Sequence, residues 1–130
     1  MKEMKSILFA FVILLVVFVL SSCASKEMKQ VRNIPINEVD LSNVQDGSYK
    51  GDFSYGGFTY EVEVTVKEHR IDNIEILKNR DTKHAKKAEG VVEKVLNAQS
   101  LKVDVVTGAT TTSKALLKAI ENALKKGVSQ

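Results

Sequence analysis

The chain has 130 residues, of which 44% are hydrophobic and 27% are charged, with one Cys, one Pro and no Trp. This length allows one domain with attachments and excludes a large enzyme with a separate substrate domain. A single Cys excludes an internal disulfide framework, a Cys-ligated iron–sulfur cluster and a multi-Cys zinc site. The net charge of +3 arises from Lys interleaved with Asp and Glu, so we expect no nucleic-acid partner.

The first 22 residues have the pattern of an export signal. Two lysines precede an unbroken apolar run over residues 7–20, which is shorter than the ~20 residues that a bilayer-spanning helix needs. The run ends in Leu20-Ser21-Ser22-Cys23, an aliphatic residue, two small ones and a Cys, as in a lipobox. We therefore predict a lipoprotein signal peptide over residues 1–22, cleaved before a lipidated Cys23. The alternative is a free Cys at the edge of an ordinary signal or short anchor helix.

The predicted lipid on Cys23 indicates where the protein is located and how the rest of the chain is arranged. A lipidated Cys23 would hold the protein to the cell membrane on its extracytoplasmic side. Residues 23–45 are polar, contain the only proline and lack a sustained period, so we interpret them as the lipidated Cys and a tether, with a short ordered piece around Val39. The folded domain is predicted over residues 46–127.

Two-residue periodicity predicts three strands at the start of the domain. Apolar and polar residues alternate over residues 49–55 and again over residues 58–66, with Gly56-Gly57 suited to the turn between them. A third strand is expected over residues 71–77. The pairing of neighbouring segments through short turns indicates an antiparallel sheet.

The aromatic residues of the domain all lie in the first two predicted strands. They could pack on a flat ligand, but such a stripe is more often the hydrophobic face of a hairpin. We expect Phe53 and Tyr60 in the core, and Tyr55 and Phe58, beside the glycine turn, to be more exposed.

The second half of the domain changes period. From His84 to Leu96 the apolar residues follow helical spacing, residues 101–105 alternate as a short fourth strand, and residues 116–124 mark a terminal amphipathic helix that Gly127 would end. The predicted fold class is α+β, with an antiparallel sheet of three to four strands and two amphipathic helices packed on it.

The chemistry concentrates in residues 104–113, which read Asp-Val-Val-Thr-Gly-Ala-Thr-Thr-Thr-Ser. They form a loop of small and hydroxyl residues before a helix, where free backbone N–H groups and the positive helix end favour an anion, most naturally a phosphate. Gly108 and Ala109 leave room for a ligand or a modifying enzyme. The alternative is that the Thr and Ser side chains only cap the helix.

This loop resembles the signature of the FMN-binding domain family, and residues 46–51 resemble that family's opening strand. The family includes subunits of the sodium-pumping NADH:quinone reductase, subunits of its ferredoxin-linked relative, and small exported lipoproteins of extracellular electron transfer. The resemblance covers residues 46–126. It implies FMN as the cofactor, with a flavin transferase moving FMN from FAD onto the hydroxyl of Thr110 as a phosphoester.

The resemblance also implies the other site residues. Asp104 matches an acidic residue six positions before the acceptor, which would help the transferase recognise the loop or bond its amides. Residues 79–84 lack the Pro and Gly of longer members, so contacts to the flavin ring cannot be transferred from them. We predict no catalytic residues and no metal site. The cofactor-binding set is Asp104, Thr107, Gly108, Ala109, Thr110, Thr111 and Thr112.

These features predict a membrane-tethered flavoprotein that carries electrons between a membrane redox partner and an external acceptor. Two alternatives stay open: a lipoprotein that binds FMN without a covalent bond, and an interaction or ligand-binding lipoprotein without flavin. A stand-alone enzyme is least expected, because no acid–base or nucleophile constellation is visible.

Overall fold

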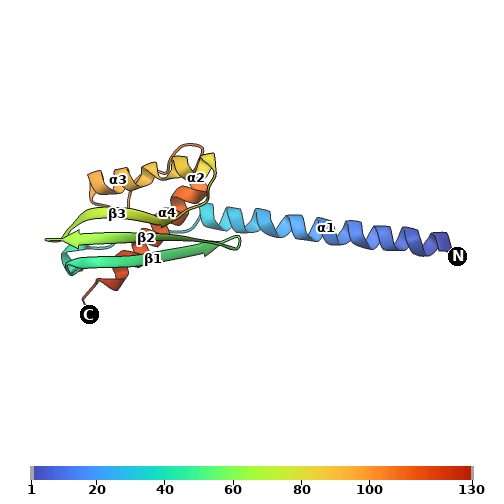
Figure 1. The fold of residues 1–130 in the computed structure, drawn as a ribbon, viewed down its shortest axis with the longest axis horizontal. Coiled ribbons are helices and arrows are strands. Elements are labelled where there is room, and N and C mark those ends of the chain that lie inside the picture. The colour runs from blue at the N-terminus through green and yellow to red at the C-terminus, as the bar shows by residue number, and fades with distance from the viewer. Residues whose placement is uncertain (1, 130) are drawn as a thin grey trace.

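The computed structural model describes residues 2–129, except for the side chains of residues 2, 17–25 and 27. A long N-terminal helix is followed by a three-stranded sheet and three further helices (Figure 1). In chain order the elements are α1 (Lys2–Arg32), η1 (Leu41–Asn43), β1 (Gly47–Tyr55), β2 (Phe58–Lys67), β3 (Arg70–Lys78), α2 (Lys83–Ala88), α3 (Gly90–Ala98) and α4 (Thr110–Lys126).

The sheet is an antiparallel meander in the order β1-β2-β3. Gly56 and Gly57 join β1 to β2 with φ values of +58° and +73°, a left-handed conformation that glycine adopts without a steric penalty. The three strands predicted from two-residue periodicity are therefore confirmed, each within a few residues of its expected bounds.

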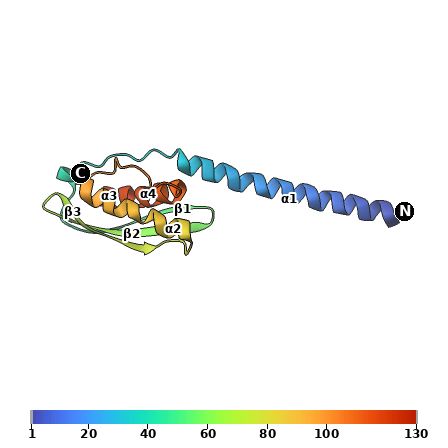
Figure 2. The same cartoon turned by 90° about the horizontal axis from the view of Figure 1, so that it is seen from above.

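The helices cover one face of this sheet and leave the other face to solvent (Figure 2). The residues of β2 that point toward the helices are fully buried, whereas their neighbours in the strand are only half-buried. This alternation follows the pleat of the strand and confirms the predicted α+β class. The buried residues are Tyr60, Val62, Val64 and Val66.

The terminal helix α4 lies directly on β1 at Gly51. A β-carbon added to Gly51 would lie 2.1 Å from the carbonyl oxygen of Ala119 and 2.4 Å from the amide nitrogen of Ala123. Only glycine allows the two backbones to approach this closely. This contact fixes the position of α4, and with it the loop at its N-terminus.

The helix predicted from His84 onward is divided into α2 and α3. The break lies at Glu89–Gly90, where the Glu89 N–H donates to the Lys86 carbonyl and the Val92 N–H to the Glu89 carbonyl. These bonds span three residues rather than four, as in a tighter 3₁₀ turn. Gly90 weakens a helix interior by about 1 kcal/mol relative to Ala, which suits the break.

The predicted fourth strand over residues 101–105 is wrong. These residues pair with no strand in the described part of the chain, and the sheet stops at three strands. Instead, the carboxylate of Glu38 accepts the N–H of Leu101 at 3.1 Å, and the Ser100 hydroxyl accepts the N–H of Lys102 at 3.0 Å. Side chains thus take the place of a neighbouring strand.

Helix α1 projects away from the domain and meets it only at its C-terminal end (Figure 1). The linker segment, residues 33–44, then runs across α4 on the side away from the sheet (Figure 2). Its Val39 and Val44 are buried, and Val44 forms an isolated β-bridge with Val128. The packed part of the chain therefore begins before residue 46, because apolar residues scattered through the linker find places on α4.

The lipobox cysteine, Cys23, lies within α1, and its side chain is outside the described residues. Its lipidation therefore stays a prediction. Within the part of the chain that the structure describes, no helix is both long and apolar enough to cross a membrane.

Candidate functional site

The loop before α4 is held in one shape by two internal hydrogen bonds. The Ala109 N–H donates to the Val106 carbonyl at 2.9 Å, and Gly108 has a φ of +80°, as the third position of a type II turn requires. The Val106 N–H donates to the hydroxyl of Ser113 at 3.2 Å, and Ser113 is fully buried. A buried residue of α4 itself therefore fixes the loop.

The N-terminus of α4 is left open. Its N-cap position is Ala109, and no side chain forms a capping hydrogen bond there. The amide N–H groups of residues 110–112 have no acceptor within a helix that starts at this point. The hydroxyl residues do not cap α4, so this structure does not support the interpretation of the cluster as a cap alone.

The four threonines of the loop and of the first turn of α4 differ in accessibility. Thr107 is exposed, Thr110 is half-buried, and Thr111 and Thr112 are only 9% and 8% exposed. Of these, Thr110, Thr111 and Thr112 line a cavity, whereas Thr107 is not among its lining residues. Thr110 is therefore the threonine that combines an accessible side chain with a place on the cavity wall.

This cavity has a volume of about 310 Å³, at the small end of the range for ligand sites. Four parts of the chain form it: the loop with the first turn of α4, the last turns of α1, the hairpin end of β1, and one residue of α2. The lining residues are Met28, Arg32, Tyr55, His84, Gly108, Ala109, Thr110, Thr111 and Thr112.

The side chains around the loop suit an anion. The Arg32 Nε donates to the hydroxyl of Thr111 at 3.1 Å, and a β-carbon placed on Gly108 would lie 3.5 Å from the Lys87 Nζ. No Asp or Glu is among the described residues that line the cavity. Two cations, several hydroxyls and an open helix N-terminus are the groups that hold a phosphate, so the residues fit the phosphate of FMN.

Tyr55 forms the aromatic wall of the cavity. Its ring stacks on Tyr60 with centroids 5.4 Å apart, and the Tyr60 hydroxyl donates to the Tyr55 hydroxyl at 3.1 Å. Burial is the main cause that raises the pKa of Tyr55 to about 12, and the hydrogen bond and charge of the neighbouring Tyr60 add to it. A hydrogen bond from Thr112 and the charge of Arg80 lower the pKa, but by less. Tyr55 therefore stays neutral at physiological pH and offers a ring and a hydroxyl rather than a base.

Arg80 holds this aromatic group from the other side. Its Nε donates to the Tyr60 hydroxyl at 3.0 Å, and its guanidinium lies 5.0 Å from the Phe58 ring centroid. Of the four aromatics whose burial was predicted, Tyr60 is fully buried and Phe53, Tyr55 and Phe58 are half-buried. The expected contrast between Phe53 and the two residues beside the turn is therefore absent, because Arg80 covers the hairpin end.

A second hollow of about 580 Å³ lies on the other side of Tyr55, between β1, the end of α1 and the linker segment. Phe53 and Tyr55 are among the residues that line it. None of the lining residues comes from the loop before α4. Residues of the last turns of α1 line both spaces, so the two hollows both border the C-terminal end of α1.

Asp104 lies apart from the cavity. Its side chain is exposed, it is not one of the residues that line the space, and its carbonyl accepts a hydrogen bond from the Lys94 Nζ at 3.2 Å. The structure thus brings together residues 108–112 but not Asp104 or Thr107.

Sequence reasoning missed three contributors: Met28, Arg32 and Lys87. The first two belong to a segment interpreted as a tether, and no local pattern shows that it folds back on the domain. Lys87 and His84 lie in α2, and helical spacing alone does not indicate which of its polar side chains turn toward the loop. The one available signal was the presence of basic residues at helical spacing just before the domain. Among the described residues, no three His, Cys, Asp or Glu side chains form a group that could hold a metal ion.

Comparison with known proteins agrees with this geometry. Residues 55–125, more than half of the chain, match the FMN-binding domain. The chain is also similar to an uncharacterized protein of Treponema pallidum (strain Nichols), with 32% identity over 87 residues, 65% of this chain. The aligned region spans only 24% of that relative. The matched region contains β2, β3 and all three helices of the domain, together with the loop and its threonines. The chain therefore belongs to the FMN-binding domain family, and FMN is its cofactor.

Proposed function

We propose that this protein is a membrane-tethered, extracytoplasmic electron carrier that holds FMN covalently on Thr110. The observation that carries the proposal is the open N-terminus of α4, where the accessible Thr110 lies on the wall of a cavity that Arg32 also lines. When bound, FMN accepts and returns one or two electrons, and the protein supplies its position and surroundings.

The attachment needs only a hydroxyl at the right place on this chain. A flavin transferase would provide FAD, and the Thr110 Oγ would form a bond to the flavin-side phosphorus. The pyrophosphate bond of FAD breaks, AMP leaves, and the hydroxyl proton passes to the transferase or to water. The product is a phosphodiester that carries one negative charge. The N–H groups of residues 110–112 and the positive end of α4 stabilise a charge at that position.

The accessibility of the threonines supports Thr110 over its neighbours. Thr111 and Thr112 are nearly buried, and Thr111 already accepts a hydrogen bond from Arg32. A transferase must bring the phosphorus of FAD within bonding distance of the hydroxyl, which a half-buried side chain on a cavity wall permits.

The continuity of α1 supports a role at the membrane. The helix runs without a break from Lys2 to Arg32 and thus passes through position 23. At 1.5 Å per residue, about 14 Å of helix separates Cys23 from Arg32. A lipid on Cys23 would therefore keep the flavin cavity close to the bilayer surface, where a membrane redox partner can reach it.

The test is to express the full chain with and without a flavin transferase, and to examine it on a denaturing gel under blue light and by intact mass. The proposal predicts a fluorescent band whose mass is increased by FMN less one water, and the loss of both in Thr110→Ala. Ser48→Ala is the matched control, because Ser48 is an exposed hydroxyl residue of β1 outside the loop and the cavity wall, and it should be labelled like the unaltered chain.

Other outcomes would redirect the proposal. Flavin that comes off on denaturation would identify non-covalent FMN binding. A labelled Thr110→Ala variant would move the attachment to a neighbouring hydroxyl. For the tether, metabolic labelling with a fatty acid should mark the chain and should fail in Cys23→Ser; equal labelling of both would contradict lipidation at Cys23.

A further inference from the structure

We infer that the segment before the domain completes the flavin site, and that Arg32 at the end of α1 binds the phosphate of the flavin. The inference rests on the proposed attachment at Thr110 and adds to it a cation from outside residues 55–125, the region that matches the FMN-binding domain. It makes the last turns of α1 part of the cofactor site rather than a spacer.

Arg32 is held in place by its own hydrogen bond and by the burial of its neighbour Val31. Its Nε donates to the Thr111 hydroxyl at 3.1 Å, while the neighbouring Val31 is 5% exposed. Arg32 and the proposed acceptor Thr110 line the same cavity, so the guanidinium stands beside the place where the phosphate would form.

Among the described residues, the side chain of Arg32 makes one hydrogen bond. A guanidinium has five N–H donors in a planar fork, and one of them serves Thr111. Within the described part of the chain, no carboxylate forms an ion pair with Arg32. A planar fork with free donors matches two oxygens of a phosphate, a pairing that is stronger than a neutral hydrogen bond.

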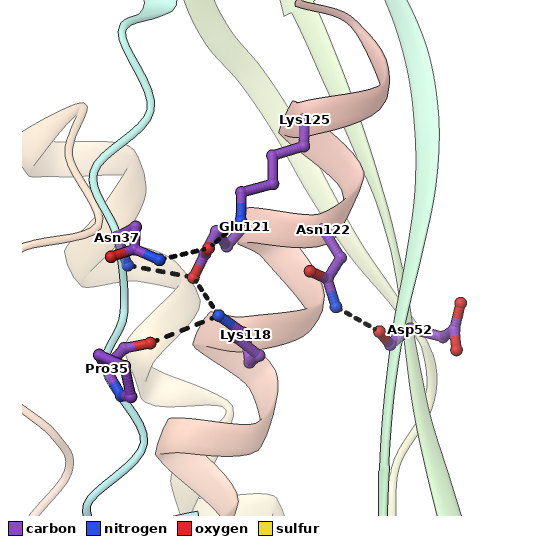
Figure 3. Close-up of polar contacts among 7 residues, drawn as sticks. All are labelled: Pro35, Asn37, Asp52, Lys118, Glu121, Asn122 and Lys125. Atoms are coloured by element: carbon purple, nitrogen blue, oxygen red, sulfur yellow. Dashed lines mark hydrogen bonds and ion pairs between the residues drawn. The ribbon is translucent and has the colours of Figure 1, made fainter.

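The linker segment explains why the C-terminal end of α1 lies at the cavity. It is fastened along α4 by Asn37, whose backbone N–H and side-chain amide both donate to the buried carboxylate of Glu121, at 3.1 and 3.3 Å (Figure 3). Lys118 adds a hydrogen bond to the carbonyl of Pro35 at 3.4 Å (Figure 3). These contacts begin three residues after Arg32, so α4 itself determines where the end of α1 lies.

The experiment must separate a phosphate contact from a bond that only fastens α1 to α4. We would compare the full chain, purified in detergent, as Arg32→Ala, Arg32→Lys and Lys26→Ala. Lys26 is an exposed basic residue of the same helix and lines neither hollow, so its variant is the matched control. Each variant is prepared with and without covalent flavin. Thermal unfolding midpoints are measured for both forms, and the ³¹P resonance is recorded for the loaded form.

If Arg32 binds the phosphate, its effect depends on the flavin. Arg32→Ala should lower the midpoint of the loaded form by several degrees more than that of the flavin-free form, and it should shift the ³¹P resonance. Arg32→Lys should restore part of both effects, and Lys26→Ala should match the unaltered chain.

The opposite result is equally clear. Equal lowering of both midpoints, with an unchanged ³¹P resonance, would show that Arg32 only holds α1 on α4 and would overturn the inference while leaving the attachment at Thr110 intact. Failure of the unaltered chain to load flavin would overturn the proposed function itself, and the inference with it.

Discussion

Two helices of the domain begin after a loop that contains threonine, and they begin in different ways. Helix α2 is capped: the Thr82 hydroxyl accepts the N–H of Ala85 at 3.1 Å. Helix α4 has more hydroxyl residues around its start, with Thr107 in the preceding loop and Thr110 to Ser113 in its first turn, yet its N-cap is Ala109 and no side chain caps it. The difference teaches that hydroxyl residues near the start of a helix are not caps by default, and that the open helix end is the one at the cofactor cavity.

Because no side chain caps the N-terminus of α4, contacts elsewhere along the helix must stabilise it. That support lies in its middle and last turns, where the fully buried Glu121 pairs with Lys118 at 3.0 Å and Lys125 at 2.5 Å, and receives both hydrogen bonds from Asn37 (Figure 3). Asn122 donates to the Asp52 carbonyl of β1 at 2.8 Å (Figure 3). Within the described residues, no buried side-chain polar atom lacks a partner. The buried side-chain polar groups of α4 thus have partners, whereas its N-terminus has no side-chain cap.

The largest expected effect on stability is that of Glu121→Ala. It leaves two lysines and the Asn37 N–H without their shared acceptor, and the loss of one partner from a buried ion pair costs about 3 kcal/mol. Urea unfolding measures the change, with Glu75→Ala on the exposed sheet face as the control. A loss below about 0.5 kcal/mol would show that α4 does not depend on this network.

The same carboxylate predicts a dependence on pH. Burial raises the pKa of Glu121, but hydrogen bonds from Lys125, Lys118 and Asn37 outweigh it, so the pKa lies below the ordinary 4.5. A lowered folded-state pKa gives stability that is complete above the unfolded value and is lost as pH falls through the folded one. The stability difference between the unaltered chain and Glu121→Gln should therefore shrink below pH 4.5. A constant difference from pH 7 to pH 3 would contradict this origin.

A smaller effect tests the two helix ends directly. Thr82→Ala removes a cap and should cost about 1 kcal/mol, whereas Thr110→Ala removes no capping bond and should change the stability of the flavin-free protein by less than about 0.5 kcal/mol. Chemical unfolding of both variants without flavin gives the comparison. Equal losses would mean that Thr110 does cap α4, and the distinction between the two ends would fail.

The fold could be predicted largely because its signals are local. Period-two alternation from Tyr49 to Leu77 and helical spacing from Leu116 to Leu124 each depend on neighbouring residues, and these elements are confirmed. The segment over residues 101–105 alternates as well, but a strand also needs a partner. The distant Glu38 occupies that backbone instead, which no local pattern reveals.

The site residues also divide into those that a local motif identifies and those that only long-range contacts bring to the cavity. Residues 108–112 form one continuous stretch, so a sequence motif could identify them. Arg32 and Met28 reach the cavity only because the linker segment folds back over α4 through Asn37 and Glu121. That fold-back depends on contacts between residues more than 80 positions apart. The prediction of residues 23–45 as a tether does not include it.

The most direct test of the account is to locate the flavin on the chain. Trypsin should release residues 103–114 as one peptide that contains every candidate hydroxyl of the loop, and fragmentation mass spectrometry assigns the modified residue. The account predicts FMN on Thr110 alone. FMN on Thr107, Thr111, Thr112 or Ser113, or an unmodified peptide from a chain exposed to an active transferase and FAD, would contradict it.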